Sequence, residues 1–236
     1  MRKMLVIIVI LLLIFVGMIV YKKVAVAKSS DIKANEVIQV EEAISKVYLW
    51  EEVTNEALPK FSDINNAEDK WIWEAVKNNL ENYELEYDEI QIKAKELFGQ
   101  KFNKEFPKEG NQSFSYSEEM QKYIAEEIET DQKEDDFLLD KIIKTKEGYE
   151  AEILEYIADY TEENIIIVRN TNDEELSRIS ASEDESAIQN VVKNKKDKCT
   201  RKKVTLKKEN ENLIIEKVES WFWGRRKKLF YIINLR

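Results

Sequence analysis

Carboxylates are almost the only side chains in this sequence that could carry catalysis. The chain contains 47 Asp and Glu residues, no histidine and a single cysteine, Cys199. The lack of histidine excludes imidazole-based catalytic triads and His-ligated zinc, and a lone cysteine excludes an intramolecular disulfide. Adjacent acids such as Asp135-Asp136 and Glu41-Glu42 could divide acid and base roles. So acidic a chain produces such neighbours by chance, and we interpret them as solvated surface.

One polar segment has the spacing of a calcium loop. Asn170-x-Asn172-x-Glu174 places oxygen side chains at the first, third and fifth positions of an EF-hand loop. However, Glu175 stands where that loop needs a glycine, and Ala181 stands where it needs a bidentate glutamate. We therefore reject an EF-hand.

The remaining patterns indicate neither a nucleotide nor a metal. The five glycines are isolated, so no glycine-rich phosphate loop is present. Cys199 lies among lysines that could stabilise a thiolate, or it is a passive residue at the start of a strand. We predict no bound cofactor and no metal site.

The segment 220–236, SWFWGRRKKLFYIINLR, combines aromatic residues with four consecutive bases. It fits a further hairpin whose rings pack on a sheet, or a contact with an anionic membrane face or cell-wall polymer. Basic and aromatic residues together can also bind nucleic acid, but an extracytoplasmic address and the acidic remainder argue against that partner. The candidate contact residues are Trp221, Trp223, Arg225, Arg226, Lys227 and Lys228.

Charge is divided unevenly along the chain, whose net charge is −10. Residues 29–192 hold 42 acids and 17 bases, whereas residues 193–236 hold 15 bases and 5 acids. Such asymmetry indicates that the basic part either lies against the acidic part or faces an anionic surface.

The N-terminal segment predicts a membrane anchor. After a short tail at residues 1–3, the uncharged residues 4–20 span ~26 Å as a helix, and Tyr21 extends them into the interface. Bases flank the segment on both sides. Ala25-Val26-Ala27 offers a signal-peptidase site instead, but Lys22 and Lys23 favour retention. The anchor at 4–21 includes Leu5, Ile8, Leu12, Phe15 and Ile19.

The bases on the two sides of the anchor are almost equal in number, so they decide its orientation weakly. The short basic tail is typical of a signal anchor, and we expect the N-terminus inside and the bulk of the chain outside. A juxtamembrane tether over residues 22–35 follows.

Helical spacing dominates the first half of the domain, residues 36–130. Apolar residues from Val37 to Leu58 predict a helix that Pro59 ends. A second helix, capped by Ser62 or Asn65, carries an apolar stripe from Trp71 to Leu80. A third opens at Asp88 and stops at Gly99, and residues 117–129 read as a strand start followed by a helix.

Alternating residues dominate the second half, residues 136–219. Strands from Phe137 and from Tyr149 to Tyr160 flank a turn at Gly148, where we expect positive φ. A short strand at Ile165–Val168 and a small helix near Ala187–Val192 follow. The last hairpin runs through Val204, Leu206, a turn at 209–212, and Leu213, Ile215 and Val218.

Helices followed by an antiparallel sheet predict an α+β fold. The order resembles cystatin-like and nuclear-transport-factor-like domains. The segments ELFG (96–99), KEFPKEG (104–110), KNKKDKCTRKKVTLKK (193–208) and IIEKVE (214–219) are similar to uncharacterised single-anchor extracytoplasmic proteins of clostridia and related Firmicutes. That resemblance implies an envelope address and brings no site residues.

These observations favour a single-pass bacterial envelope protein whose extracytoplasmic domain binds or assembles with a partner and catalyses nothing. We expect its partners to be the lipid bilayer and a protein or cell-wall component. Two alternatives stay open: a carboxylate-dependent hydrolase of cell-wall glycans, which needs two acids in one cleft, and a signalling or secretion-assembly subunit.

Overall fold

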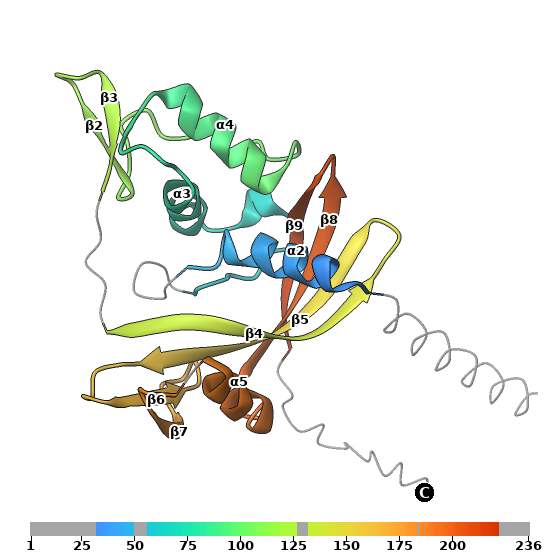
Figure 1. The fold of residues 1–236 in the computed structure, drawn as a ribbon. Helices are drawn as coiled ribbons and strands as arrows, with labels where there is room; N and C mark the ends of the chain where they lie inside the picture. The colour runs from blue at the N-terminus through green and yellow to red at the C-terminus, as the bar shows by residue number, and fades with distance from the viewer. Residues whose placement is uncertain (1–31, 50–55, 127–131, 184, 222–236) are drawn as a thin grey trace, which may run out of the picture.

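The computed structural model describes residues 32–49, 56–126, 132–183 and 185–221 (Figure 1). Four α-helices and two antiparallel sheets in these residues make an α+β fold, which confirms the predicted class. The helices are α2 (Ala34–Ser45), α3 (Asp69–Asn78), α4 (Tyr87–Phe98) and α5 (Glu185–Asn194), with a short 3-10 turn η1 (Ile64–Asn66).

The predicted anchor at 4–21 lies outside the described residues, as does the tether up to residue 31. Within the described part of the chain, no helix combines the length and the apolar composition needed to cross a bilayer. α2 begins at Ala34, so the last two residues of the segment predicted as a tether belong to this helix.

The apolar stripe of α4 and its stop at Gly99 are confirmed, whereas the helix begins at Tyr87, one residue before the predicted Asp88. The Glu89 carboxylate accepts a hydrogen bond from the backbone N–H of Glu86 at 2.8 Å, which satisfies one of the free donors at the helix start. Gly99 follows the last turn with a φ of 85°, a value that favours glycine. Ile90, Ala94 and Phe98 form the buried stripe.

The other two predicted helices need corrections. α2 ends at Ser45, well before Leu58, although Val40 and Ile44 are buried as predicted. α3 begins at Asp69, after Glu68, and it carries the predicted stripe only as far as Val76, because Leu80 lies beyond its end at Asn78. Asp63 caps only η1, by accepting from the N–H of Asn65 at 2.9 Å. The predicted caps are therefore wrong.

A small sheet interrupts the half expected to be helical. Its strands, in the order β1-β3-β2, are β1 (Glu84–Leu85), β2 (Phe114–Ser117) and β3 (Lys122–Ala125). The predicted helix after residue 117 is wrong, because the chain turns at Gln121, whose φ is 52°, and returns as β3. Tyr116 and Tyr123 then face each other across the pair.

The large sheet forks along its central strand. Its strands are β4 (Lys133–Lys144), β5 (Gly148–Asp159), β6 (Ile165–Arg169), β7 (Glu175–Ser180), β8 (Thr200–Glu209) and β9 (Asn212–Trp221). One edge of β5 pairs with β4 along its whole length. The other edge pairs with β8 from Gly148 to Glu155 and with β6 from Ile157 to Asp159. Two branches, β8-β9 and β6-β7, therefore leave the same strand.

Gly148 is required for close approach and not for positive φ. A Cβ at this position would lie 2.1 Å from the Leu206 carbonyl oxygen of the neighbouring strand. Among the described glycines, only Gly99 and Gly110 have a positive φ, so Gly148 does not. The turn prediction was right in place and wrong in its physical reason.

Two cores use opposite faces of β5, because successive strand residues point in opposite directions. The main core lies between this sheet and helices α2, α3 and α4, and it contains Ala151 and Ile153 of β5. The small core lies between α5 and strands β4 to β7, in the lower part of Figure 1. Its buried members are Leu138, Leu154, Tyr156, Ala158, Ile166, Val168, Leu176, Ile188 and Val192.

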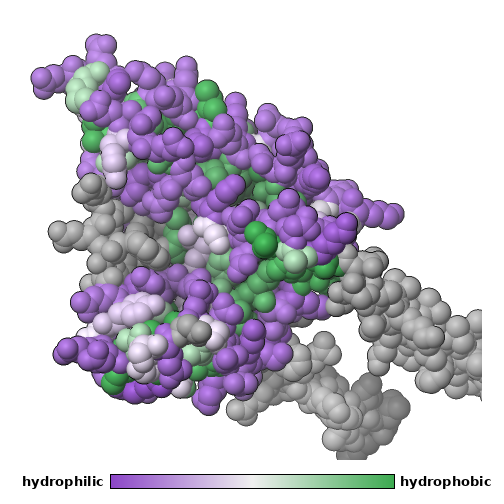
Figure 2. Space-filling model, in the orientation of Figure 1, coloured by the Kyte–Doolittle hydropathy of each residue, from purple (hydrophilic) through white to green (hydrophobic). Residues whose placement is uncertain are grey.

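Aromatic rings fill the main core. Trp71 and Trp73 of α3 are almost completely buried, and the Trp73 ring meets the edge of Phe106 with centroids 5.1 Å apart. The Trp71 Nε1–H donates to the carbonyl oxygens of Val47 (3.0 Å) and Ala57 (3.2 Å), which ties these two residues to α3. The face in Figure 2 is mainly hydrophilic, with hydrophobic residues at the level of α2.

Candidate functional site

Two deeply buried charges form an ion pair where β5 meets β8. Glu155 and Lys202 are 2% and 3% exposed, and Glu155 Oε1 lies 3.0 Å from Lys202 Nζ. Lys202 also donates to the Leu58 carbonyl oxygen at 2.6 Å and contacts Glu56 at 3.1 Å. Burial raises the pKa of Glu155, although Lys202 opposes the shift. The pair binds the segment before Pro59 to the sheet.

Asp136 belongs to one of the acid pairs found in the sequence. Its Oδ2 accepts a hydrogen bond from the Tyr156 hydroxyl at 2.5 Å on the face of the small core. Burial raises the pKa of Asp136, while hydrogen bonds from Tyr156 and from the N–H of Phe137 oppose the rise. Asp135 precedes it in the strand and points to the other face. The two carboxylates therefore do not share a site.

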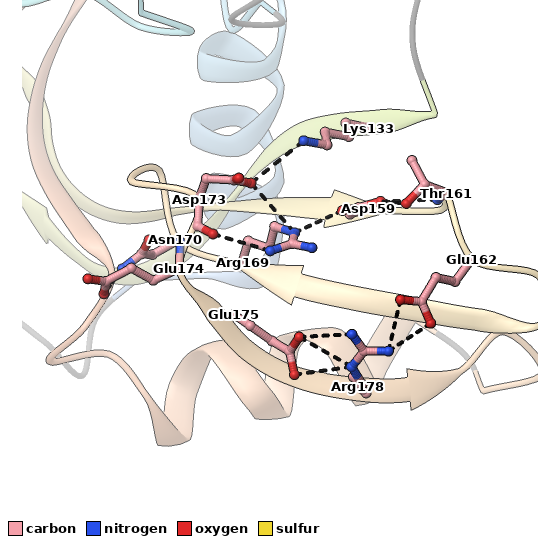
Figure 3. Close-up of polar contacts among 10 residues, drawn as sticks. All are labelled: Lys133, Asp159, Thr161, Glu162, Arg169, Asn170, Asp173, Glu174, Glu175 and Arg178. Atoms are coloured by element: carbon pink, nitrogen blue, oxygen red, sulfur yellow. Dashed lines mark hydrogen bonds and ion pairs between the residues drawn. The ribbon is translucent and has the colours of Figure 1, made fainter.

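A network of ion pairs surrounds the small core at the outer strands (Figure 3). Asp159 accepts from Arg169 Nε at 2.8 Å and from the Thr161 hydroxyl at 2.6 Å. Burial opposes ionisation of Asp159, but these hydrogen bonds and that from the Thr161 N–H outweigh it and hold its pKa at about 2. Asp173 joins the network through Arg169 (3.5 Å) and Lys133 (3.6 Å).

The calcium-like segment forms a tight turn in this network. Asn170 Oδ1 accepts from the N–H groups of Asn172 and Glu174 at 3.0 and 2.9 Å. Its Nδ2 donates to Glu174 and to the Lys198 carbonyl oxygen. Because its oxygen already serves the turn, Asn170 is a structural residue. Within the described ranges, no group of three or more acidic or cysteine side chains could hold a metal ion.

Another buried carboxylate lies in the middle of α3. Glu74 accepts from the Ser113 hydroxyl at 2.8 Å and pairs with Lys77 at 2.5 Å. Lys77 also donates to the Glu126 carbonyl oxygen at 3.0 Å. Ser113 is fully buried, so this group connects α3 to the small sheet and presents no nucleophile to solvent.

The larger of two described hollows, which we call the α2-α4 groove, lies between α2, α4 and the β8-β9 turn. Its volume is about 410 Å³, within the range of ligand sites. Side chains of α2 at i, i+3, i+4 and i+7 form one wall, because those positions share a helix face. The lining residues are Gln39, Glu42, Ala43, Lys46, Val47, Asn79, Lys93, Glu96, Leu97, Glu211, Asn212, Leu213 and Ile214.

The groove is polar at its rim and apolar at its base. Lys93 and Glu96 pair at 3.0 Å on α4, and Asn79 Nδ2 donates to the carbonyl oxygens of Lys46 (2.6 Å) and Ala75 (2.8 Å). Glu42 lines the groove and its neighbour Glu41 does not, so this acid pair is also divided. The sequence analysis missed the groove because three distant segments build it.

A second hollow lies on the other side of the β8-β9 turn. It has a volume of about 290 Å³ and extends from η1 to the strands. Glu209 connects its parts by accepting from the N–H of Gln100 at 3.1 Å. Neither hollow is lined by Asp136 or Glu155, the described carboxyl groups whose pKa is raised.

Cys199 is half-buried where the chain enters β8. Its Sγ lies 3.6 Å from the Lys195 carbonyl oxygen. Burial raises the pKa of the Cys199 thiol to about 11, and Asp197 adds to the rise while Arg201 opposes it. Of the two interpretations of Cys199, the raised pKa agrees with a passive residue at the start of a strand, since the neighbouring lysines do not compensate for desolvation of a thiolate.

The predicted contact residues lie almost entirely beyond the described part of the chain. The backbone of Trp221 ends β9 in register with Arg201, while Trp223 and the bases Arg225–Lys228 fall outside, as do the anchor residues. Comparisons with protein families, with curated proteins and with solved structures give no match for this chain.

Proposed function

We propose that this chain is a single-pass envelope protein whose extracytoplasmic domain binds or assembles with a protein or cell-wall partner at the α2-α4 groove, without catalysis. The uncharged segment 4–20, flanked by bases, supports the membrane address. The groove carries the binding proposal, because it is the larger described hollow and combines an apolar base with a mixed-charge rim.

The placement of the acids favours binding over hydrolysis. A carboxylate hydrolase needs a general acid of raised pKa beside a second carboxylate in one cleft. Asp136 and Glu155, which have raised pKa values, are engaged by Tyr156 and Lys202 inside the cores. In the groove, Glu96 is paired with Lys93.

The groove suits a polar chain better than a compact apolar ligand. Its rim offers acids, lysines and amides from α2, α4 and the β8-β9 turn, and such groups can hydrogen-bond along an extended peptide or glycan. The cystatin-like arrangement that we propose for the domain is supported by α2 lying on the antiparallel sheet (Figure 1).

The test is crosslinking in intact cells from two positions of the same residue type. A photoreactive amino acid replaces Gln39, which lines the groove, or Gln121, an exposed residue of the β2-β3 turn. We expect a discrete adduct from position 39 and none from position 121. Ala43→Phe, which fills the groove base, should weaken the adduct from position 39.

Each result decides between the alternatives. Equal adducts from both positions contradict binding at the groove. An adduct with a second copy of the chain indicates an assembly subunit. Release of wall glycan by the purified protein, abolished in Glu42→Gln, indicates the hydrolase. A reporter active only outside the cytoplasm, fused after Arg236, tests the orientation.

A further inference from the structure

Two sets of bases stand out among the described residues of the C-terminal part. Three bases at the start of β8 lie beside acids of β5: Lys203 lies 2.9 Å from Glu150, and Lys202 lies 3.0 Å from Glu155. Arg201 lies within 4 Å of an acid in β5 as well. The charges of this set are paired within the sheet, as expected if the basic part of the chain lies against the acidic part.

The second set is a cationic loop between α5 and β8, which we define as Lys193, Lys195, Lys196 and Lys198. All four side chains are exposed, and none forms an ion pair with any other described residue. Asp197 is the only acid among them. Four unpaired charges within six residues repel one another, so their placement needs a reason outside the domain.

The backbone of the cationic loop is fixed. The N–H of Lys195 donates to the Val191 carbonyl oxygen at 3.0 Å, and that of Lys198 donates to the Lys195 carbonyl oxygen at 2.8 Å. The Lys198 carbonyl oxygen also accepts from Asn170 Nδ2 at 3.1 Å. The ammonium groups therefore project from a preorganised turn, which reduces the entropy lost on binding.

The helix dipole explains only part of this arrangement. A base in the last turn of a helix interacts favourably with its free carbonyls, and Lys193 occupies that place in α5. Lys195, Lys196 and Lys198 follow the helix and lie outside its last turn. Three of the four charges thus remain without a partner among the residues that the structure describes.

We propose that the cationic loop rests on the anionic headgroups of the bilayer that anchors the chain. This inference depends on the membrane address in the proposed function. Each lysine near an anionic bilayer strengthens binding about fivefold.

The length of the chain permits this contact. The ten residues 22–31 between the anchor and the domain span at most about 35 Å when extended. β8 runs from the loop to the β8-β9 turn, and its ten residues cover about 30 Å. With the loop on the lipid, the α2-α4 groove lies at the far end of β8, away from the headgroups and open to a partner.

The test uses the full chain in vesicles of neutral phosphatidylcholine, with or without 30% phosphatidylglycerol. Amine modification read by mass spectrometry should fall at least fivefold at the loop lysines in the anionic vesicles, and 0.5 M salt should restore it. Lys70, Lys95, Lys108 and Lys122, which have no ion pair in the described structure, should change less than twofold.

Matched variants make the result specific. Energy transfer to labelled lipids, from a dye on Gln121→Cys in a Cys199→Ser background, should differ between the two vesicle types. The difference should vanish when the four loop lysines become serine. It should persist when Lys70, Lys95, Lys108 and Lys122 become serine. This control variant changes the net charge by the same amount as the loop variant but leaves the loop lysines in place.

Equal modification of the loop lysines in both vesicle types would overturn the inference. Protection by soluble polyphosphate without protection by anionic vesicles would also overturn it and would indicate a free phosphate polymer. Flotation with neutral vesicles measures membrane anchoring by the N-terminal segment alone. A chain that does not float contradicts the proposed membrane address, whereas a chain that floats without protection of the loop lysines contradicts only the loop contact.

Discussion

The two faces of β5 contribute to cores that are stabilised differently. On one face, Ala151 and Ile153 pack against tryptophan and phenylalanine rings from α3 and α4. On the other face, Leu154 and Tyr156 meet a few aliphatic residues from α5 and the outer strands. The main core therefore depends on apolar burial. The small core is enclosed by the ion pairs of Asp159 and Arg169.

This difference predicts which part of the molecule responds to solution conditions. Apolar burial is almost independent of pH and is not weakened by screening, whereas ion pairs depend on both. The small lobe, which comprises β6, β7, α5 and the end of β5, should respond to acid. The main core should not respond directly. The following substitutions test that contrast.

The largest effect is expected in the main core. Trp71→Ala removes a fully buried ring and the hydrogen bonds to Val47 and Ala57, and it should lower the free energy of unfolding by about 5 kcal/mol. The loss should be equal at pH 4 and pH 7 in urea titrations. A loss that depends strongly on pH would contradict the contrast between the cores.

The next effect concerns the charges buried between the branches. Lys202→Met leaves Glu155 without its cation and should cost about 3 kcal/mol at pH 7. The double substitution Lys202→Met with Glu155→Met should recover most of that loss, because no buried charge remains. A double-mutant cycle by urea unfolding measures the recovery. Additive losses would show that the pair does not act as a unit.

The smallest effect concerns the small lobe and depends on pH. Asp159 has a pKa of about 2 in the folded chain, below its unfolded value of about 4. Its contribution of about 2 kcal/mol is complete above pH 4 and is lost as pH falls from 4 towards 2. Asp159→Asn should remove that much of the acid dependence in unfolding between pH 6 and pH 2.5.

A matched control for Asp159 exists in the same lobe. Arg178 pairs with Glu162 (2.7 Å) and Glu175 (3.1 Å), but all three side chains are exposed (Figure 3). Arg178→Gln should cost less than about 1 kcal/mol. Hydrogen exchange of β6 amides compares the two variants. Equal costs would indicate that burial of Asp159 adds nothing to its ion pair.

Local signals in the sequence were sufficient for elements that bury one regular face. α4 combines a stripe at helical spacing with Gly99 as its stop, and the β8-β9 hairpin alternates around a polar turn, so both were predicted in place. β7 was missed because only Leu176 and Ile179 are apolar in Glu175–Ser180. An edge strand buries only one face, so it contains few apolar residues and its alternation is weak in the sequence.

Contacts between distant residues could not be read from the sequence. Glu155 and Lys202 approach because Glu155 ends the paired segment of β5 and Lys202 lies near the start of β8. The α2-α4 groove needs α2, α4 and a turn more than a hundred residues later. In both cases strand register and helix packing determine which residues come together, and neither leaves a local pattern in the sequence.

The pairing of Glu155 with Thr200 has a consequence for how this architecture can vary. The chain leaves the β5-β8 ladder and rejoins it at directly opposed residues, so everything between them is inserted at a single point. A shortened relative could replace residues 156–199 with a tight turn and keep the β5-β8-β9 order unchanged. In chain order, β6, β7 and α5 thus form one insertion between two strands that would otherwise be joined as a hairpin.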